Sequence, residues 1–309
     1  MGLNQRSISM NIVQTITDRI LSNLEAGQIP WRKTWQGGLP ASLATGREYR
    51  GINILMLGTQ DYTSRYWLTF REALRLGGHV RKGEKATPIV FWKWATPEEL
   101  ERARAQDRII PRCVPFTSQV FNIDQVDGVE RPETDVHHQP HRRLEVADLL
   151  LEVMPAKPEI THALSSNPAY APGSDRVRMP HLSQFKSADA YFAALFHELV
   201  HATGHPCRLN RFAAEEGSAL ERYSFEELVA EFGAAFLCGF SGIQNRQLDE
   251  LHTSYIAGWS EVFRKEPSIL LKAASAAQRA SDFIRGKLTL VSQDTDAVSP
   301  SSGIVQAVA

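Results

Sequence analysis

The chain has 309 residues, of which 43% are hydrophobic and 22% charged, and its net charge is −1. This composition is ordinary for a globular protein, and the length suggests about two domains. Three isolated cysteines exclude a disulfide framework, and the lack of an apolar run of about 18 residues excludes a transmembrane helix. We therefore expect a soluble, cytoplasmic protein with no membrane partner.

The first part of the chain is expected to be α+β. Apolar residues at helical spacing predict a helix over 9–26, while residues 28–50 look irregular. A short helix is predicted over 69–76, and β-branched and aromatic residues predict a strand over 87–94. Thr96-Pro97-Glu98-Glu99 has the pattern of a capping box that opens a polar helix to about residue 106, and a second strand is expected over 112–123.

The composition changes after residue 124, where a polar stretch with few large apolar residues suggests a linker over 125–143. The second domain, 144–288, is expected to be mainly helical with a short β-sheet. We predict a helix near 144–153, short strands at 158–163 and around the turn at 172–175, and helical blocks at 187–203, 224–240 and 252–285. A polar tail at 289–309 is expected to be disordered.

The strongest chemical signal is the run His197-Glu198-Leu-Val-His201, which lies inside the helix predicted over 187–203. Histidines at positions i and i+4 stand one turn apart on one face and can bind the same Zn²⁺ ion, while Glu198 can act as a general base. The run is expected roughly 0.02 times by chance. The plainer interpretation is a helix with two hydrogen-bonded histidines. We expect His205 to be a loop residue, since it follows Gly204.

A catalytic zinc ion needs a third protein ligand. Glu227 and Glu231 share one face of the next predicted helix, where small residues permit close packing, and we favour Glu227 as the ligand with Glu231 orienting a histidine. Alternatively, Ser224 and Glu227 form a capping box and Glu231 binds the metal. Glu226 points away from this face and is expected to be solvated. Tyr255 is a candidate to stabilise an oxyanion, although a core position is the plainer interpretation.

The first domain combines positive charge with aromatic rings. Residues 29–94 contain eleven Lys/Arg against four acids, an excess of seven positive charges, and five of the six tryptophans. A cationic groove with aromatic faces is what single-stranded DNA binding requires. The competing interpretation is that the tryptophans form the core and the charges a solvated face.

Several of these segments resemble ArdC-type antirestriction proteins of conjugative plasmids. Pro30-Trp31, Thr45–Asn53, Trp67–Phe70, Val80–Lys85 and Val90–Lys93 resemble their N-terminal domain, which certain plasmid primases share. His197–His205, Arg208–Arg211 and Glu226–Glu231 resemble their C-terminal metallopeptidase-like domain. The resemblance implies single-stranded DNA binding by the first domain, a zincin-like second domain with His197 and His201 as ligands and Glu198 as base, and protection of incoming plasmid DNA during conjugation.

These expectations combine into one hypothesis and one alternative. The chain is expected to be a single-stranded-DNA-binding antirestriction protein with one Zn²⁺ ion in a metallopeptidase-like site. Alternatively, it is a zinc metallopeptidase that acts on DNA-bound host proteins or restriction enzymes, with the N-terminal domain for targeting. The residues expected to contact DNA are Trp31, Arg32, Lys33, Arg47, Tyr49, Arg50, Asn53, Trp67, Arg81, Lys82, Lys85, Trp92 and Lys93.

Overall fold

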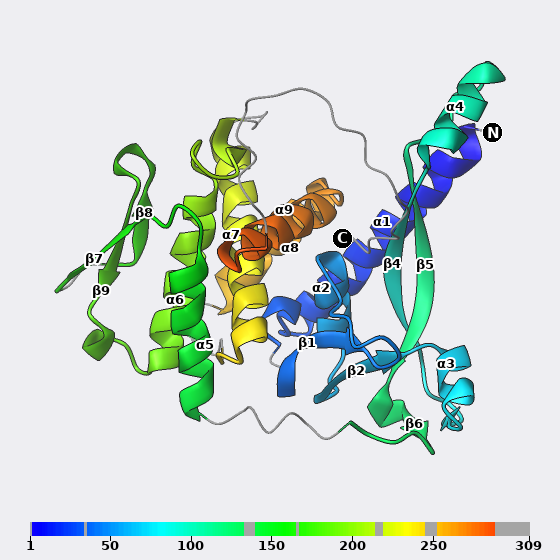
Figure 1. Cartoon of the computed structure of the whole chain (residues 1–309), viewed down its shortest axis with the longest axis horizontal. Helices are drawn as coiled ribbons and strands as arrows, with labels where there is room; N and C mark the ends of the chain where they lie inside the picture. The colour runs from blue at the N-terminus through cyan, green and yellow to red at the C-terminus, as the bar shows by residue number, and fades with distance from the viewer. Residues whose placement is uncertain are drawn as a thin grey trace.

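A computed structural model of the chain describes residues 2–33, 36–132, 140–164, 167–213, 219–244 and 252–287. The N-terminal region is α+β (Figure 1). Its elements are α1 (Gly2–Glu25), η1 (Pro30–Arg32), β1 (Gln36–Ser42), α2 (Ile52–Gly58), β2 (Ser64–Leu68), α3 (Phe70–Arg75), β3 (His79–Val80), β4 (Thr87–Trp94), α4 (Pro97–Ala105), β5 (Cys113–Asn122), η2 (Ile123–Gln125) and β6 (Val126–Asp127).

The sheet of this region has the strand order β1-β2-β5-β4. β1 and β2 are parallel, whereas β5 is antiparallel to both of its neighbours. The β4–β5 hairpin is long and carries α4 at its far end (Figure 1), where the predicted capping box of Thr96 and Glu99 is formed. The side chain of Asn53 joins α2 to β4, because it donates to the Val90 carbonyl (2.8 Å) and accepts from the Val90 N–H (2.7 Å).

The C-terminal region is mainly helical. Its elements are α5 (Pro140–Val153), β7 (Glu159–Ala163), β8 (Ala169–Ala171), η3 (Pro172–Ser174), β9 (Arg176–Pro180), η4 (Leu182–Gln184), α6 (Ala188–Thr203), η5 (Arg211–Ala213), α7 (Ala219–Ser241), α8 (His252–Lys265) and α9 (Ile269–Ile284). A three-stranded sheet in the order β7-β9-β8 lies beside α6 (Figure 1).

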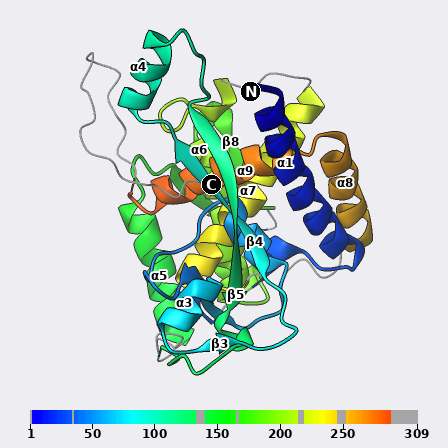
Figure 2. The ribbon, with the colours of Figure 1, turned by 90° about the vertical axis from the view of Figure 1, so that its right-hand side faces the viewer.

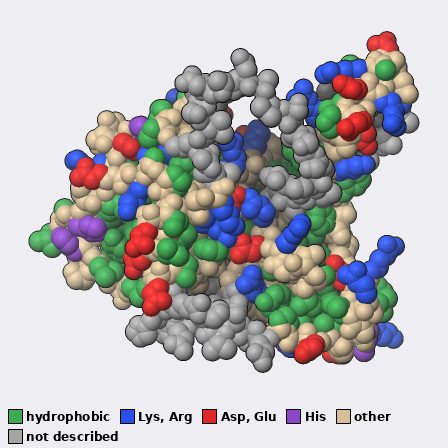
Figure 3. Space-filling view, in the orientation of Figure 1, with side chains coloured by type: hydrophobic (Ala, Val, Ile, Leu, Met, Phe, Trp, Pro, Cys, Tyr) green, Lys and Arg blue, Asp and Glu red, His purple; other side chains and the backbone are tan. Residues whose placement is uncertain are grey.

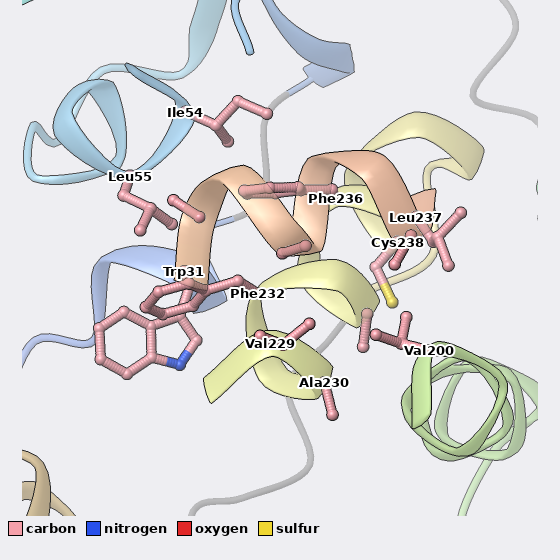
Figure 4. Packing of buried hydrophobic residues seen from close by; sticks show 14 of the residues in the cluster. Trp31, Ile54, Leu55, Val200, Val229, Ala230, Phe232, Phe236, Leu237 and Cys238 are labelled. Atoms are coloured by element: carbon pink, nitrogen blue, oxygen red, sulfur yellow. The ribbon is translucent and has the colours of Figure 1, made fainter. Parts of the chain in front are cut away.

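One hydrophobic core joins the two regions. The Trp31 ring lies edge-on against Phe232 of α7, with ring centroids 5.0 Å apart, and against Phe263 of α8 at 6.3 Å. Figure 4 shows Trp31 beside Phe232 of α7 within the cluster of buried apolar side chains. Helices α1 and α8 run alongside one another at the same junction (Figure 2).

Polar contacts reinforce this junction at α9. The Arg50 guanidinium pairs with the Asp282 carboxylate, and the backbone N–H of Gly51 donates to the Gln278 side chain at 2.9 Å. Gly51 has a φ of 54° and a ψ of −126°, a conformation that non-glycine residues rarely adopt. Arg285 reaches back to Glu48 at 3.1 Å. The two regions therefore pack against each other through a shared interface and are not separate domains joined only by a linker.

The structure confirms the α+β class and most of the predicted elements, and it corrects four expectations. Residues 28–50 are not irregular throughout, since β1 occupies 36–42. The expected linker over 125–143 contains secondary structure among its described residues, because β6 pairs with β3 and α5 begins at residue 140. The block 252–285 is two helices separated at 266–268.

The fourth correction concerns the start of the helix predicted over 224–240. It begins earlier, at residue 219, so that Ser224 lies inside it. The predicted tail at 289–309 lies outside the described residues. Within the described part of the chain, every helix is too short or too polar to cross a bilayer.

Replacing Trp31 with alanine tests the shared core. The ring is 3% exposed, and its removal leaves a cavity between α7 and the N-terminal region. We expect the free energy of unfolding to fall by about 3–5 kcal/mol in urea denaturation. The control is Trp94→Ala, because Trp94 is 58% exposed and its loss should change stability by no more than about 0.5 kcal/mol. Equal effects of the two substitutions would contradict the shared core.

Candidate functional site

Helix α6 brings the two histidines of the motif together. The Ser187 hydroxyl caps its first turn by accepting from the Ala190 N–H at 3.2 Å, and Gly204 follows its last residue. The apolar face of α6 is buried, and residues 197 and 201 face α7 one turn apart. Their Nε2 atoms are 3.1 Å from one another.

Close packing of α7 against α6 supplies the carboxylate. A Cβ atom at Gly233 would lie 2.7 Å from the Val200 side chain, so a larger residue would push the helices apart. Glu227 faces both histidines: its Oε2 lies 3.5 Å from Nε2 of His197, and its Oε1 lies 3.6 Å from Nε2 of His201. The structure therefore brings His197, His201 and Glu227 into one group of potential metal ligands.

The distances between these three ligand atoms suit a cation with tetrahedral coordination. Metal–ligand bonds of about 2.0–2.2 Å at tetrahedral angles place neighbouring ligand atoms about 3.3–3.6 Å apart. The two carboxylate–imidazole separations, 3.5 and 3.6 Å, fall within that range, and the separation of the two imidazole nitrogens, 3.1 Å, is slightly shorter. The donor set of two imidazoles and one carboxylate suits a divalent transition metal and leaves one position for water or substrate.

A second carboxylate orients His201. Glu226 is buried and its Oε1 accepts from Nδ1–H of His201 at 3.1 Å, which leaves the Nε2 lone pair free for a cation. The Arg211 guanidinium donates two hydrogen bonds, of 2.6 and 2.7 Å, to the Glu226 carboxylate. Burial alone would raise the pKa of Glu226, but the bonds from Arg211 and His201 lower it below the ordinary value. The expectation that Glu226 is solvated is therefore wrong.

Glu198 is held by the neighbouring sheet. Its carboxylate is buried and accepts from the backbone N–H of Tyr170 in β8 at 2.7 Å. Its negative charge acts on His197: burial lowers the pKa of that imidazole, but Glu227, Glu231 and Glu198 together outweigh burial and raise it. Three carboxylates around one buried imidazole favour a positive charge at this point.

Glu231 lies one turn further along α7 and outside the triad, although its charge also acts on His197. Because Ser224 is inside the helix, Glu227 is not occupied as the partner of a capping box. Tyr223, which no sequence pattern indicated, contacts Glu227, and the charge of Glu227 raises the pKa of its phenol. The side chain of Tyr255 lies outside the described residues.

The residues expected to contact DNA separate into buried and accessible groups. Trp31, Trp67 and Asn53 are buried, so their side chains serve the core and a base cannot stack on them. Arg32, Lys33, Tyr49, Arg50 and Trp92 are half-buried, and Arg47, Arg81, Lys82, Lys85 and Lys93 are exposed.

Some of the positively charged residues expected to contact DNA already form ion pairs within the protein. Lys33 pairs with Asp61, Arg50 with Asp282, and Arg81 with Glu84. Figure 3 shows basic side chains gathered in the middle of one face, at the hollow between the helical region and the β4–β5 side. Trp94 and Phe116, near the end of the hairpin, are exposed aromatic rings that are not among the residues expected to contact DNA.

The C-terminal region is helix-rich and zincin-like, and it follows an α+β N-terminal region. Residues 10–121 match the family described as the N-terminal domain of anti-restriction factor ArdC, and residues 147–276 match the family described as zincin-like metallopeptidase. The solved structure of antirestriction protein ArdC from plasmid R388, in its Mn(II)-bound form, is similar with a TM-score of 0.69 and 32% identity, over 89% of this chain and 97% of that one.

The metal-free structure of the same R388 protein has a TM-score of 0.70 and 33% identity over the same shares. The uncharacterized protein y4eC of Sinorhizobium fredii (strain NBRC 101917 / NGR234) is 32% identical over 90% of this chain and 92% of that protein. The DNA primase TraC of Escherichia coli is 32% identical over 88% of this chain, which spans only 27% of the primase. This chain belongs to the ArdC family.

The orienting role of Glu226 is testable by the substitution Glu226→Gln. The neutral amide cannot match the carboxylate in fixing His201, and we expect the affinity for Zn²⁺ to fall about 10–100-fold in a chelator competition titration. Glu261→Gln is the control, because Glu261 is exposed and pairs only with Lys265 among the described residues. Equal affinities in the two variants would remove this role from Glu226.

Proposed function

We propose that this chain is a single-stranded-DNA-binding antirestriction protein with one Zn²⁺ ion in a metallopeptidase-type centre, and that it protects plasmid DNA in the recipient cell during conjugation. The observation that carries the proposal is the similarity to R388 ArdC, which extends over 97% of that protein and includes both regions in the same order. The Mn(II)-bound form of that relative supports a divalent cation between α6 and α7 here.

In this proposal His197, His201 and Glu227 hold the ion. A zinc ion in such a site polarises a carbonyl group and lowers the pKa of a bound water. Glu198 is the general base: the Tyr170 N–H fixes one carboxylate oxygen and thereby the orientation of the group. Arg211 and Glu226 keep His201 in one tautomer throughout. Glu231 lies outside this triad, and its charge adds to the field around His197.

For DNA binding, the proposed contacts are the accessible residues of the N-terminal region, because the buried ones cannot reach a DNA strand. Lys82 and Lys85 precede β4, and Trp92, Lys93 and Trp94 end it. The strand has eight residues and therefore extends about 26 Å between these two groups. Phosphates can contact the lysines at either end while a base stacks on an accessible ring. Arg47 adds an exposed positive charge in the turn after β1.

Stacking on Trp94 is testable by Trp94→Ala. Loss of one stacked base should weaken binding of a labelled single-stranded oligonucleotide by about 1–3 kcal/mol, measured by fluorescence anisotropy. Phe70→Ala is the matched control, since Phe70 is 52% exposed but lies in α3, at the other end of the β4–β5 hairpin (Figure 1). Wild-type affinity should also fall steeply with salt. Flat salt dependence or a preference for duplex DNA would contradict single-strand binding.

The second candidate function is proteolysis of DNA-bound host proteins or restriction enzymes, with the N-terminal region for targeting. The observation that favours it is the buried Glu198 carboxylate, which accepts from the Tyr170 N–H at 2.7 Å on the same helix as His197 and His201. An inert structural metal would not need that fixed carboxylate.

The substitution Glu198→Gln separates the two functions. The bound metal should remain, because Glu198 lies outside the ligand triad, and any hydrolysis of a labelled unfolded protein should fall by about 100–10,000-fold. We expect the variant to protect unmodified plasmid DNA entering a restricting host as well as the wild type does, because DNA binding carries the protection. Loss of protection together with hydrolysis would favour the proteolytic alternative.

A further inference from the structure

A second group of metal-ligating side chains lies outside the centre described above. His205 and Cys207 stand in the loop after α6, and Asp175 ends the turn between β8 and β9. One ligand atom from each lies within 4.8 Å of the other two. A cysteine, a histidine and an aspartate converge here from two segments that are about 30 positions apart in the sequence.

The separations suit a thiolate-bound cation. Sγ of Cys207 lies 3.0 Å from Nδ1 of His205 and 3.9 Å from Oδ2 of Asp175. Bonds of about 2.3 Å to sulfur and about 2.0–2.2 Å to nitrogen or oxygen, at tetrahedral angles, require about 3.5 Å between ligand atoms. The observed values fall on either side of that figure, and the loop side chains need to move by only about half an ångström.

The Nδ1 atom of His205 carries the lone pair that a cation would use. It accepts from the backbone N–H of Cys207 at 3.3 Å, so that the ring carries its proton on Nε2, and a bound cation would replace this hydrogen bond. The Cys207 thiol lies against the same nitrogen. When a cation binds, the thiol proton leaves to solvent and the thiolate and imidazole both face the ion.

Asp175 is held in place from behind. The fully buried Arg208 side chain contacts both of its carboxylate oxygens, and the Tyr170 hydroxyl donates to Oδ1 at 2.8 Å. Oδ2 faces Cys207. The charge of Arg208 compensates that of Asp175, so the carboxylate alone attracts a hard cation weakly. Attraction depends on the thiolate, which selects a soft ion such as Zn²⁺ over Mg²⁺ or Ca²⁺.

We propose that Asp175, His205 and Cys207 form a second divalent-metal site, for a thiophilic ion such as Zn²⁺ with water as the fourth ligand. The ion ties the β8–β9 turn to the loop after α6. Tyr170 links this site to the metallopeptidase-type centre, since its hydroxyl contacts Asp175 and its backbone N–H holds Glu198. The second ion therefore stabilises the strand that positions the base.

The test is a Co²⁺ titration of the full-length, metal-free, reduced protein, followed by absorption. A thiolate bound to Co²⁺ gives a ligand-to-metal charge-transfer band that imidazole and carboxylate ligands lack. We expect two equivalents to bind in the wild type and the band to accompany one of them. In Cys207→Ser, the band and one equivalent should be lost, while Cys113→Ser, which removes another free cysteine, should keep both.

Two further variants separate the sites. His205→Gln should lose the same equivalent as Cys207→Ser, and it serves in place of that variant if the circular dichroism spectrum of the serine protein differs from wild type. His197→Ala should lose the other equivalent and keep the band. One equivalent in the wild type, or a band that survives both Cys207→Ser and His205→Gln, would overturn the proposal. Failure of the second site leaves the first equivalent, and hence the proposed function, unaffected.

Discussion

The close approach of α6 and α7 is the constraint on which the group of His197, His201 and Glu227 depends. Side chains from two helices can share one cation only if the helix axes come near enough for short carboxylates and imidazoles to meet. Gly233 permits this approach, because a Cβ at that position would meet the Val200 side chain. Packing of an apolar interface thus determines the geometry of a polar site.

The polar residues around that site are arranged in layers, each of which restrains the next. Arg211 fixes Glu226, Glu226 fixes His201, and His201 shares Glu227 with His197. Arg211 also donates to the Val200 carbonyl and to the Thr203 hydroxyl, so that the outermost layer is anchored to α6 itself. A buried group of this kind is stable only if nearly every charge has a partner.

The sequence predicted the parts of this arrangement that depend on local pattern. The His-Glu-x-x-His spacing, the helix over 187–203 and the strand at 87–94 are local signals, and each appears in the structure as expected. What could not be predicted depends on contacts between distant segments. Nothing near Trp31 in the chain indicates that its ring fits between α7 and α8, and the neighbours of Glu226 do not reveal that Arg211 turns back towards it. The basic and aromatic composition of residues 29–94 likewise could not separate core rings from accessible ones.

The shared core around Trp31 has a consequence for how such proteins can diverge. Two domains that are joined only by a flexible linker can be exchanged between genes without changing how either domain packs. Here the pocket for the Trp31 ring is made by α7 and α8, and the partners of Arg50 and Gly51 are on α9. Recombination that joins halves from distant relatives must therefore also preserve the packing at this interface. That requirement favours inheritance of both regions as a single unit.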